Sequence, residues 1–109
     1  MNEVKMNILD ALSNLKKLTE EELLVLRDKL DEIKNNPAVL ASLDITETEK
    51  SLTKKIMEEI LSCVNSYHLN FGVIQSNHII PQEYSDIIRK YHPATVIIKI
   101  NRLLSSIYL

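Results

Sequence analysis

Three histidines are the residues whose type most readily suggests a metal site in this sequence. His68, His78 and His92 stand near the carboxylates of Glu83 and Asp86 in the chain, and imidazole with carboxylate is a common ligand set for zinc. Zinc-binding histidines on a helix recur at i and i+4 or at similarly short spacings. The separations here match none of these spacings, so we expect neither a metal site nor a cofactor.

Cys63 is the single cysteine of the chain and the obvious candidate for a nucleophile. It falls on the apolar stripe of a predicted helix, where burial would disfavour the thiolate that nucleophilic attack requires. We therefore expect a structural thiol. One cysteine forms no disulfide within the chain, which is typical of a reducing compartment, so we expect a cytoplasmic protein.

The carboxylates include close pairs, and paired carboxylates can serve as general acid and general base. The pairs here are Glu20 with Glu22, Asp31 with Glu32, and Glu58 with Glu59. All lie beside lysines on the polar sides of predicted helices, as solvated surfaces do. Carboxylate catalysis would need burial or a cleft, so the sequence predicts a protein that is not an enzyme.

The elements that position these residues are predicted to be helices. The chain has 109 residues, of which 45% are hydrophobic and 26% are charged, typical of one globular domain. It contains one glycine, whereas hairpins and phosphate-binding loops need glycine where φ is positive. We expect a single all-α domain over residues 1–109, a compact bundle of four to five helices.

The charge balance gives little support to nucleic acid as a partner. The net charge is −2, and residues 1–60 carry nine Lys and Arg against thirteen Asp and Glu, whereas residues 61–109 carry four against two. Binding to a phosphate backbone relies on a basic surface.

Two helices are predicted in the first third of the chain. The first covers residues 3–17, where the apolar residues at helical spacing are Val4, Ile8, Ala11, Leu12 and Leu15. Thr19 and Glu22 have the spacing of a capping box and predict a second helix over residues 19–35. This helix must end there because Pro37 disfavours helical geometry in the residue before it.

The longest predicted helix covers residues 46–70. Either Asp44 with Glu47 or Thr46 with Glu49 can supply the cap at its start. Gly72 follows its last apolar residue and suits the left-handed position that closes many helices. Before this helix, residues 37–43 predict a short helix or turn that opens with Pro37.

The last third predicts two more helices. One covers residues 81–91 with Pro81 in its first turn, and the other covers residues 94–108. The apolar face of the second comprises Val96, Ile97, Ile100, Leu103, Leu104, Ile107 and Tyr108. Residues 71–80 are rich in β-branched side chains and predict either a small hairpin or a structured loop.

No segment offers the roughly 20 apolar residues that a bilayer-spanning helix needs. Lys99, Asn101 and Arg102 interrupt the most apolar run, residues 92–109. We therefore expect no membrane span.

A few residues do not fit the predicted buried faces. Leu24 and Val25 fall off the leucine stripe of their helix, and Ile98 and Leu109 fall on the side of the last helix that carries Arg102. Exposed aliphatic residues can form a partner surface. We therefore predict partner binding through Leu24, Val25, Ile98, Arg102 and Leu109, either with another protein or in a homodimer.

Residues 83–104, EYSDIIRKYHPATVIIKINRLL, resemble a helix-turn-helix, and Ala94-Thr95-Val96 is similar to the start of a bacterial repressor's recognition helix. The resemblance implies a DNA-binding regulator. The break lacks the expected glycine, and Ile97 and Ile98 cannot hydrogen-bond to base edges. DNA binding is therefore the alternative to protein binding.

Two shorter resemblances cover parts of the chain. ILDALSNLKKLTEEELLVLRDKLDEI resembles the first two helices of a pyrin-type death-fold domain, and SYHL with HIIPQEY is similar to parts of the immunity proteins against pediocin-like bacteriocins. Any leucine-striped helix pair with a capping box produces the first pattern, so we assign no family. The sequence predicts a small non-enzymatic protein-interaction module, a regulatory, inhibitory or assembly factor of bacterial or viral type.

Overall fold

The computed structural model describes residues 6–72 and 81–109. Within these ranges the elements are α1 (Ile8–Ser13), the 3-10 helix η1 (Leu15–Lys17), α2 (Glu20–Lys34), α3 (Pro37–Ala41), α4 (Glu47–Leu69), α6 (Tyr84–Tyr91) and α7 (Thr95–Leu104). The described residues form no strand beyond one isolated bridge. The all-α prediction is confirmed.

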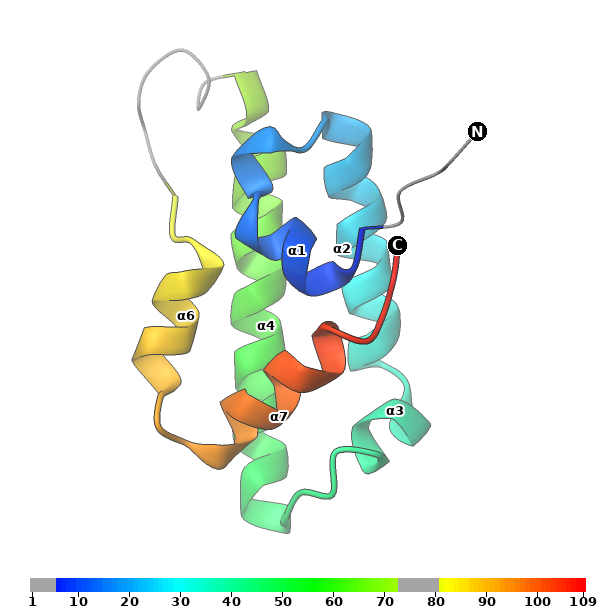
Figure 1. Cartoon of the computed structure of the whole chain (residues 1–109), viewed down its shortest axis with the longest axis vertical. Coiled ribbons are helices and arrows are strands. Elements are labelled where there is room, and N and C mark those ends of the chain that lie inside the picture. Colours follow the sequence, from blue (N-terminus) through cyan, green and yellow to red (C-terminus); the bar gives the residue numbers. More distant parts are fainter. Residues whose placement is uncertain (1–5, 73–80) are drawn as a thin grey trace.

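The helices α2 and α4 form an antiparallel pair at the centre of the bundle, and they share its most extensive helix–helix contact (Figure 1). Both helices begin with the predicted capping boxes. The Glu22 N–H donates to Thr19 Oγ1 at 3.1 Å, and the Glu49 N–H donates to Thr46 Oγ1 at 3.2 Å. In each box the glutamate also accepts a hydrogen bond from the threonine N–H, so the first free amides of both helices are satisfied.

The helices α6 and α7 pack against α4, and α1 packs against α6 and α7 (Figure 1). One hydrophobic core joins them, and every described helix except α3 contributes fully buried side chains to it. The most deeply buried residues include Ile8, Leu26, Leu30, Ile56, Ile60, Ile87, Ile100 and Leu104.

The prediction of one continuous helix over residues 3–17 is wrong. The structure describes this segment from Met6 onward, and α1 starts only after Asn7, whose Oδ1 accepts a hydrogen bond from the Asp10 N–H at 2.7 Å. The chain then leaves helical geometry at Asn14, where φ is −130°, before the single turn of η1. The break lets the buried faces of α1 and η1 point to the core independently.

The predicted helix over residues 94–108 is too long. It ends at Leu104, and the hydroxyls of Ser105 and Ser106 donate back to the carbonyls of Arg102 and Leu103. The remaining tail runs antiparallel to the start of α1, because the Ile8 N–H donates to Ile107 O at 2.8 Å and the Leu109 N–H donates to Met6 O at 3.0 Å.

The prediction that Tyr108 lies on the buried face of the last helix is therefore wrong. Tyr108 occupies the antiparallel bridge to Asn7, and 52% of its surface is exposed. The helical spacing of apolar residues continues into this tail, but the backbone hydrogen bonds to the segment around Met6 and Ile8 determine its conformation.

The helix predicted over residues 81–91 starts too early, because α6 begins at Tyr84 and Pro81 lies before its first turn. The helix predicted over residues 46–70 agrees with α4, which ends at Leu69 with Asn70 as its cap. Gly72 does not have the positive φ that was predicted for it. The short helix α3 starts with Pro37 and agrees with the short helix or turn predicted over residues 37–43. The hairpin or loop predicted over residues 71–80 falls almost entirely outside the described residues.

In the part of the chain that the structure describes, no helix combines the length and hydrophobicity needed to span a membrane.

Candidate functional site

A groove of about 700 Å³ lies between the end of α2, α3 and the first half of α4. We call it the α3 groove. Its lining residues are Lys34, Asn35, Pro37, Leu40, Ala41, Asp44, Ile45, Lys50, Thr53, Lys54 and Met57. The volume lies within the range of about 300–1,000 Å³ that is typical of ligand sites.

The floor of the α3 groove is apolar and has no unsatisfied side-chain group. Met57 is buried, and the buried Thr53 hydroxyl donates to Glu49 O at 2.7 Å. Leu40 and Ile45 are partly buried against the core. A ligand on this floor should therefore offer mainly an apolar surface, because the other floor side chains are apolar and the Thr53 hydroxyl has already donated its proton.

α3 itself explains why this surface is open. Its five residues, PAVLA, are all apolar, yet none is fully buried. Pro37 and Ala41 are exposed. A short helix of this composition contributes little to the core and instead presents an apolar wall to solvent, as binding surfaces do.

The charged residues that line the groove are three lysines and one aspartate. Lys34 pairs with Glu58 at 3.7 Å and Lys50 with Glu47 at 2.8 Å, whereas Lys54 forms no ion pair with the described residues. The lining thus carries more lysines than acids, and Lys54, which has no partner among the described residues, favours an acidic ligand.

The loop between α3 and α4 closes one end of the groove. Asp44 has a positive φ of 53°, a conformation that aspartate tolerates better than most residues. Lys99 of α7 donates to the Asp44 carbonyl at 2.6 Å, and the buried Leu43 anchors the loop in the core. Contacts from two sides thus fix the end of the groove.

The five residues predicted to bind a partner lie apart from the α3 groove. Val25 is 52% exposed and Leu24 partly buried on α2, while Ile98 on α7 is 46% exposed beside the exposed Arg102. Leu109 is partly buried against the core. The structure therefore brings Leu24 and Val25 together on α2 and Ile98 and Arg102 together on α7, and it places Leu109 in the tail.

Sequence reasoning did not identify the groove residues as a site. The available signal was the segment PAVLASL, which is apolar but too short for a helix that could bury both its sides. The groove becomes visible only when this segment stands next to lysines that lie 13 to 17 positions away from Pro37, at Lys50 and Lys54.

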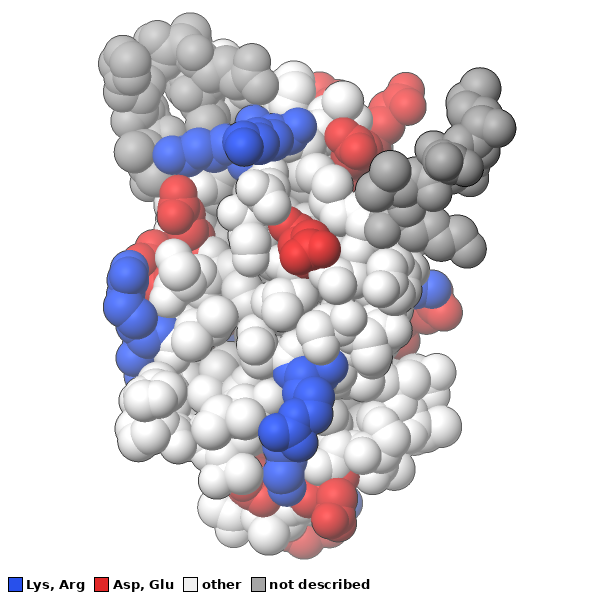
Figure 2. Space-filling view, in the orientation of Figure 1, with Lys and Arg blue, Asp and Glu red and all other residues white. Residues whose placement is uncertain are grey.

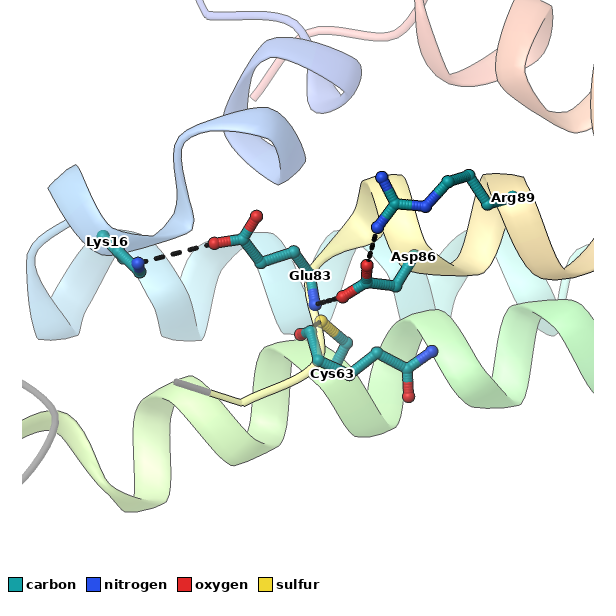
Figure 3. A network of polar contacts seen from close by, with 6 residues as sticks. Lys16, Cys63, Glu83, Asp86 and Arg89 are labelled. Atoms are coloured by element: carbon teal, nitrogen blue, oxygen red, sulfur yellow. Dashed lines mark hydrogen bonds and ion pairs between the residues drawn. The ribbon is translucent and has the colours of Figure 1, made fainter. Parts of the chain in front are cut away.

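A second polar cluster joins η1, α4 and α6 (Figure 3). Lys16 pairs with Glu83 at 3.5 Å, Asp86 pairs with Arg89, and the Glu83 N–H donates to Asp86 Oδ2 at 3.0 Å. The hydrogen bond from the Glu83 backbone, aided by Arg89, lowers the pKa of Asp86 below its ordinary value. These contacts cap α6 and fasten its first turn to its neighbours.

Cys63 lies under this cluster, and its buried position confirms the prediction of a thiol within the core (Figure 3). Its Sγ donates to Gln82 O at 2.7 Å. Burial, with smaller contributions from Asp86 and Glu83, raises the pKa of the thiol to about 12. The thiol is therefore protonated at neutral pH and acts as a packing and hydrogen-bonding group.

The two histidines that the structure describes lie in different elements. His68 lies in the last turn of α4, and His92 is the cap residue that follows α6, while His78 lies outside the described residues. Among the described residues, no three His, Cys, Asp or Glu side chains are grouped closely enough to hold a metal ion.

The proposed helix-turn-helix corresponds to α6, the link His92–Ala94 and α7. Val96 and Ile97, at the start of α7, are buried, although this is where a recognition helix presents side chains to base edges. Figure 2 shows Lys and Arg in separate groups on the described part of this face, with broad uncharged areas between them. The surface here differs from the continuous basic footprint typical of DNA-binding domains.

Comparisons with known proteins found no matching family, no curated protein of significant similarity and no solved structure of significant similarity.

Proposed function

We propose that this protein is a small non-enzymatic protein-interaction module, a regulatory, inhibitory or assembly factor of bacterial or viral type, that binds an acidic amphipathic helix of its partner in the α3 groove. The observation that carries the proposal is α3, a helix of five apolar residues of which none is fully buried. A cytoplasmic setting belongs to the same proposal and is supported by the single, unpaired Cys63.

The chemistry of the groove supports a helix as the ligand. An amphipathic helix places its apolar face in a hydrophobic groove, with anchors at i, i+3 or i+4, and i+7. Leu40, Ile45 and Met57 would contact such anchors. Acidic residues beside the anchors would meet Lys50 and Lys54 at the rim, where partly exposed ion pairs contribute about 0.2–1 kcal/mol each.

The proposal is tested by titrating the protein with a labelled synthetic helical peptide that has leucines at i, i+3 and i+7 and glutamates beside them. Lys54→Glu should weaken binding about fivefold, because losing one attraction and adding one repulsion at the rim costs about 1 kcal/mol in total. Lys55→Glu is the matched control. Lys55 is also exposed on α4 but does not line the groove, so this variant should bind as the wild type does.

Three results would count against the proposal. The first is the absence of peptide binding, and the second is equal weakening by Lys54→Glu and Lys55→Glu, which would indicate a general charge effect. The third is binding of a simple amphipathic anion such as dodecanoate without binding of the peptide, which would make the groove a small-molecule site. Salt-sensitive binding of labelled duplex DNA would instead support the helix-turn-helix alternative.

A further inference from the structure

The solvent side of α2 carries an acidic surface with an apolar centre. Its residues recur three or four positions apart and therefore share one side of the helix; they are Glu21, Leu24, Val25, Asp28 and Glu32. We call them the α2 stripe. They lie opposite the buried residues of the same helix, Leu23, Leu26, Leu30 and Ile33.

The side chains of the α2 stripe are largely accessible to solvent, including the aliphatic ones at its centre. Val25 is 52% exposed, Leu24 is partly buried, and all three acids are exposed. Asp28 pairs with its neighbour Arg27 at 3.1 Å, while Glu21 and Glu32 form no ion pair with the described residues. The stripe thus has two aliphatic side chains with carboxylates on either side along one helix.

The α2 stripe combines aliphatic and acidic side chains, which are the groups that the α3 groove is proposed to bind. We propose that the α2 stripe of one copy of this chain docks in the α3 groove of a second copy. This inference rests on the proposed function of the groove and names one partner for it. Leu24 and Val25 contact the apolar floor and α3, and the neighbouring carboxylates contact the rim lysines, of which Lys54 has no ion pair within the described chain.

The stripe of a molecule cannot reach its own groove. Val25 and Lys34 belong to the same continuous helix, where they lie about 13 Å apart along the axis at about 1.5 Å per residue. The contact must therefore form between molecules. Because it joins two different surfaces, it is heterologous. An open assembly then keeps one free stripe at one end and one free groove at the other, where further copies can bind unless a ring closes.

The test uses two single variants whose effects are complementary. Val25→Asp places a fourth carboxylate in the stripe, at its apolar centre, and inactivates the stripe, whereas Ala41→Glu places a carboxylate in the groove wall and inactivates the groove. Both residues are exposed, so circular dichroism should show wild-type helicity for each variant. By sedimentation velocity, the mean mass of the wild type should rise with concentration and fall as salt is added.

Each variant alone should remain monomeric, since each lacks one of the two surfaces. An equal mixture should form a 1:1 heterodimer and nothing larger, because the intact stripe of the Ala41→Glu chain can bind the intact groove of the Val25→Asp chain. This mixing result is specific to a contact between these two surfaces. Ile98→Asp, which changes a similarly exposed aliphatic residue on α7, should associate as the wild type does.

A wild type that stays monomeric up to a concentration of about 1 mM would overturn the inference. A mixture that stays monomeric would also overturn it, as would loss of association in Ile98→Asp. Binding of the acidic peptide by Val25→Asp separates the two proposals. If the peptide binds but no association occurs, only the self-contact is wrong, whereas failure of both removes the groove as a docking site.

Discussion

At the scale of single residues, burial and hydrogen bonding determine what Cys63 can do. Its thiol donates to Gln82 O and lies among core side chains. Its pKa rises from an ordinary 9.0 to about 12, chiefly because burial disfavours the charged thiolate. A thiol in this environment is a poor nucleophile at neutral pH.

Alkylation by iodoacetamide should therefore be very slow in the folded protein. At pH 8 the thiolate fraction should be about a thousandfold smaller than in the unfolded chain, since each pKa unit changes it about tenfold. Mass spectrometry of the native protein and of the protein in urea gives both rates. Native alkylation as fast as that of the unfolded chain would show that the thiol is accessible.

The same pKa shift has a defined effect on stability. A group whose pKa is raised in the folded state stabilises it below the ordinary pKa, and this contribution is lost as the pH rises. For Cys63 the loss falls between pH 9.0 and about 12. Cys63→Ala should accordingly show a smaller decrease in the free energy of unfolding across this range than the wild type.

At the scale of elements, the capping box at the start of α4 connects the groove to the longest helix. Thr46 and Glu49 follow directly after the loop that closes the groove. A hydrogen bond from the Thr46 backbone lowers the pKa of Glu49 below its ordinary value, as expected for a carboxylate that accepts an amide proton. The box therefore holds the loop and the helix start in one geometry.

Thr46→Ala should lower the free energy of unfolding by about 1 kcal/mol, the usual cost of losing such a cap. Urea denaturation measures this value. Thr48→Ala is the matched control, because Thr48 is an exposed residue in the first turn of the same helix. A Thr48→Ala effect equal to that of Thr46→Ala would contradict a specific role for the cap.

Elements with local start signals were the predictable part of the fold. Thr19 with Glu22 and Thr46 with Glu49 fix the starts of α2 and α4 through interactions three residues apart. The sequence locates the first start, and for the second it offers this pair and Asp44 with Glu47, between which the structure decides. The tail after Leu104 was not predictable in this way. Its helical spacing continues to Tyr108, but the deciding hydrogen bonds reach back to Met6 and Ile8, about a hundred positions away.

The α3 groove was not predictable for a similar reason. No segment of its lining has a recognisable motif, and its character arises where three segments meet. The apolar residues of the groove come mainly from α3 and the loop after it, and its lysines come from α2 and α4. Leu24 and Val25, in contrast, could be identified from their helical phase, and their exposed or half-buried positions on α2 agree with that phase.

At the scale of the whole molecule, the proposed function depends on charged groups placed around one apolar groove. The chain has a net charge of −2, yet the charged groups that line the groove are three lysines and one aspartate. Exposed charges are screened beyond about 8 Å at physiological ionic strength. Binding to the groove should therefore weaken with added salt but persist through the apolar contacts, in contrast to nucleic-acid binding, which falls steeply with salt.

The most direct measurement is a methyl-resolved NMR titration of the wild-type protein with the acidic amphipathic peptide. We expect saturable chemical-shift changes for the methyl groups of Leu40, Ile45 and Met57, whereas the methyl signals of Ile98 should not change. Shifts confined to Ile98 and its neighbours on α7, with the three groove residues unaffected, would contradict the proposed function.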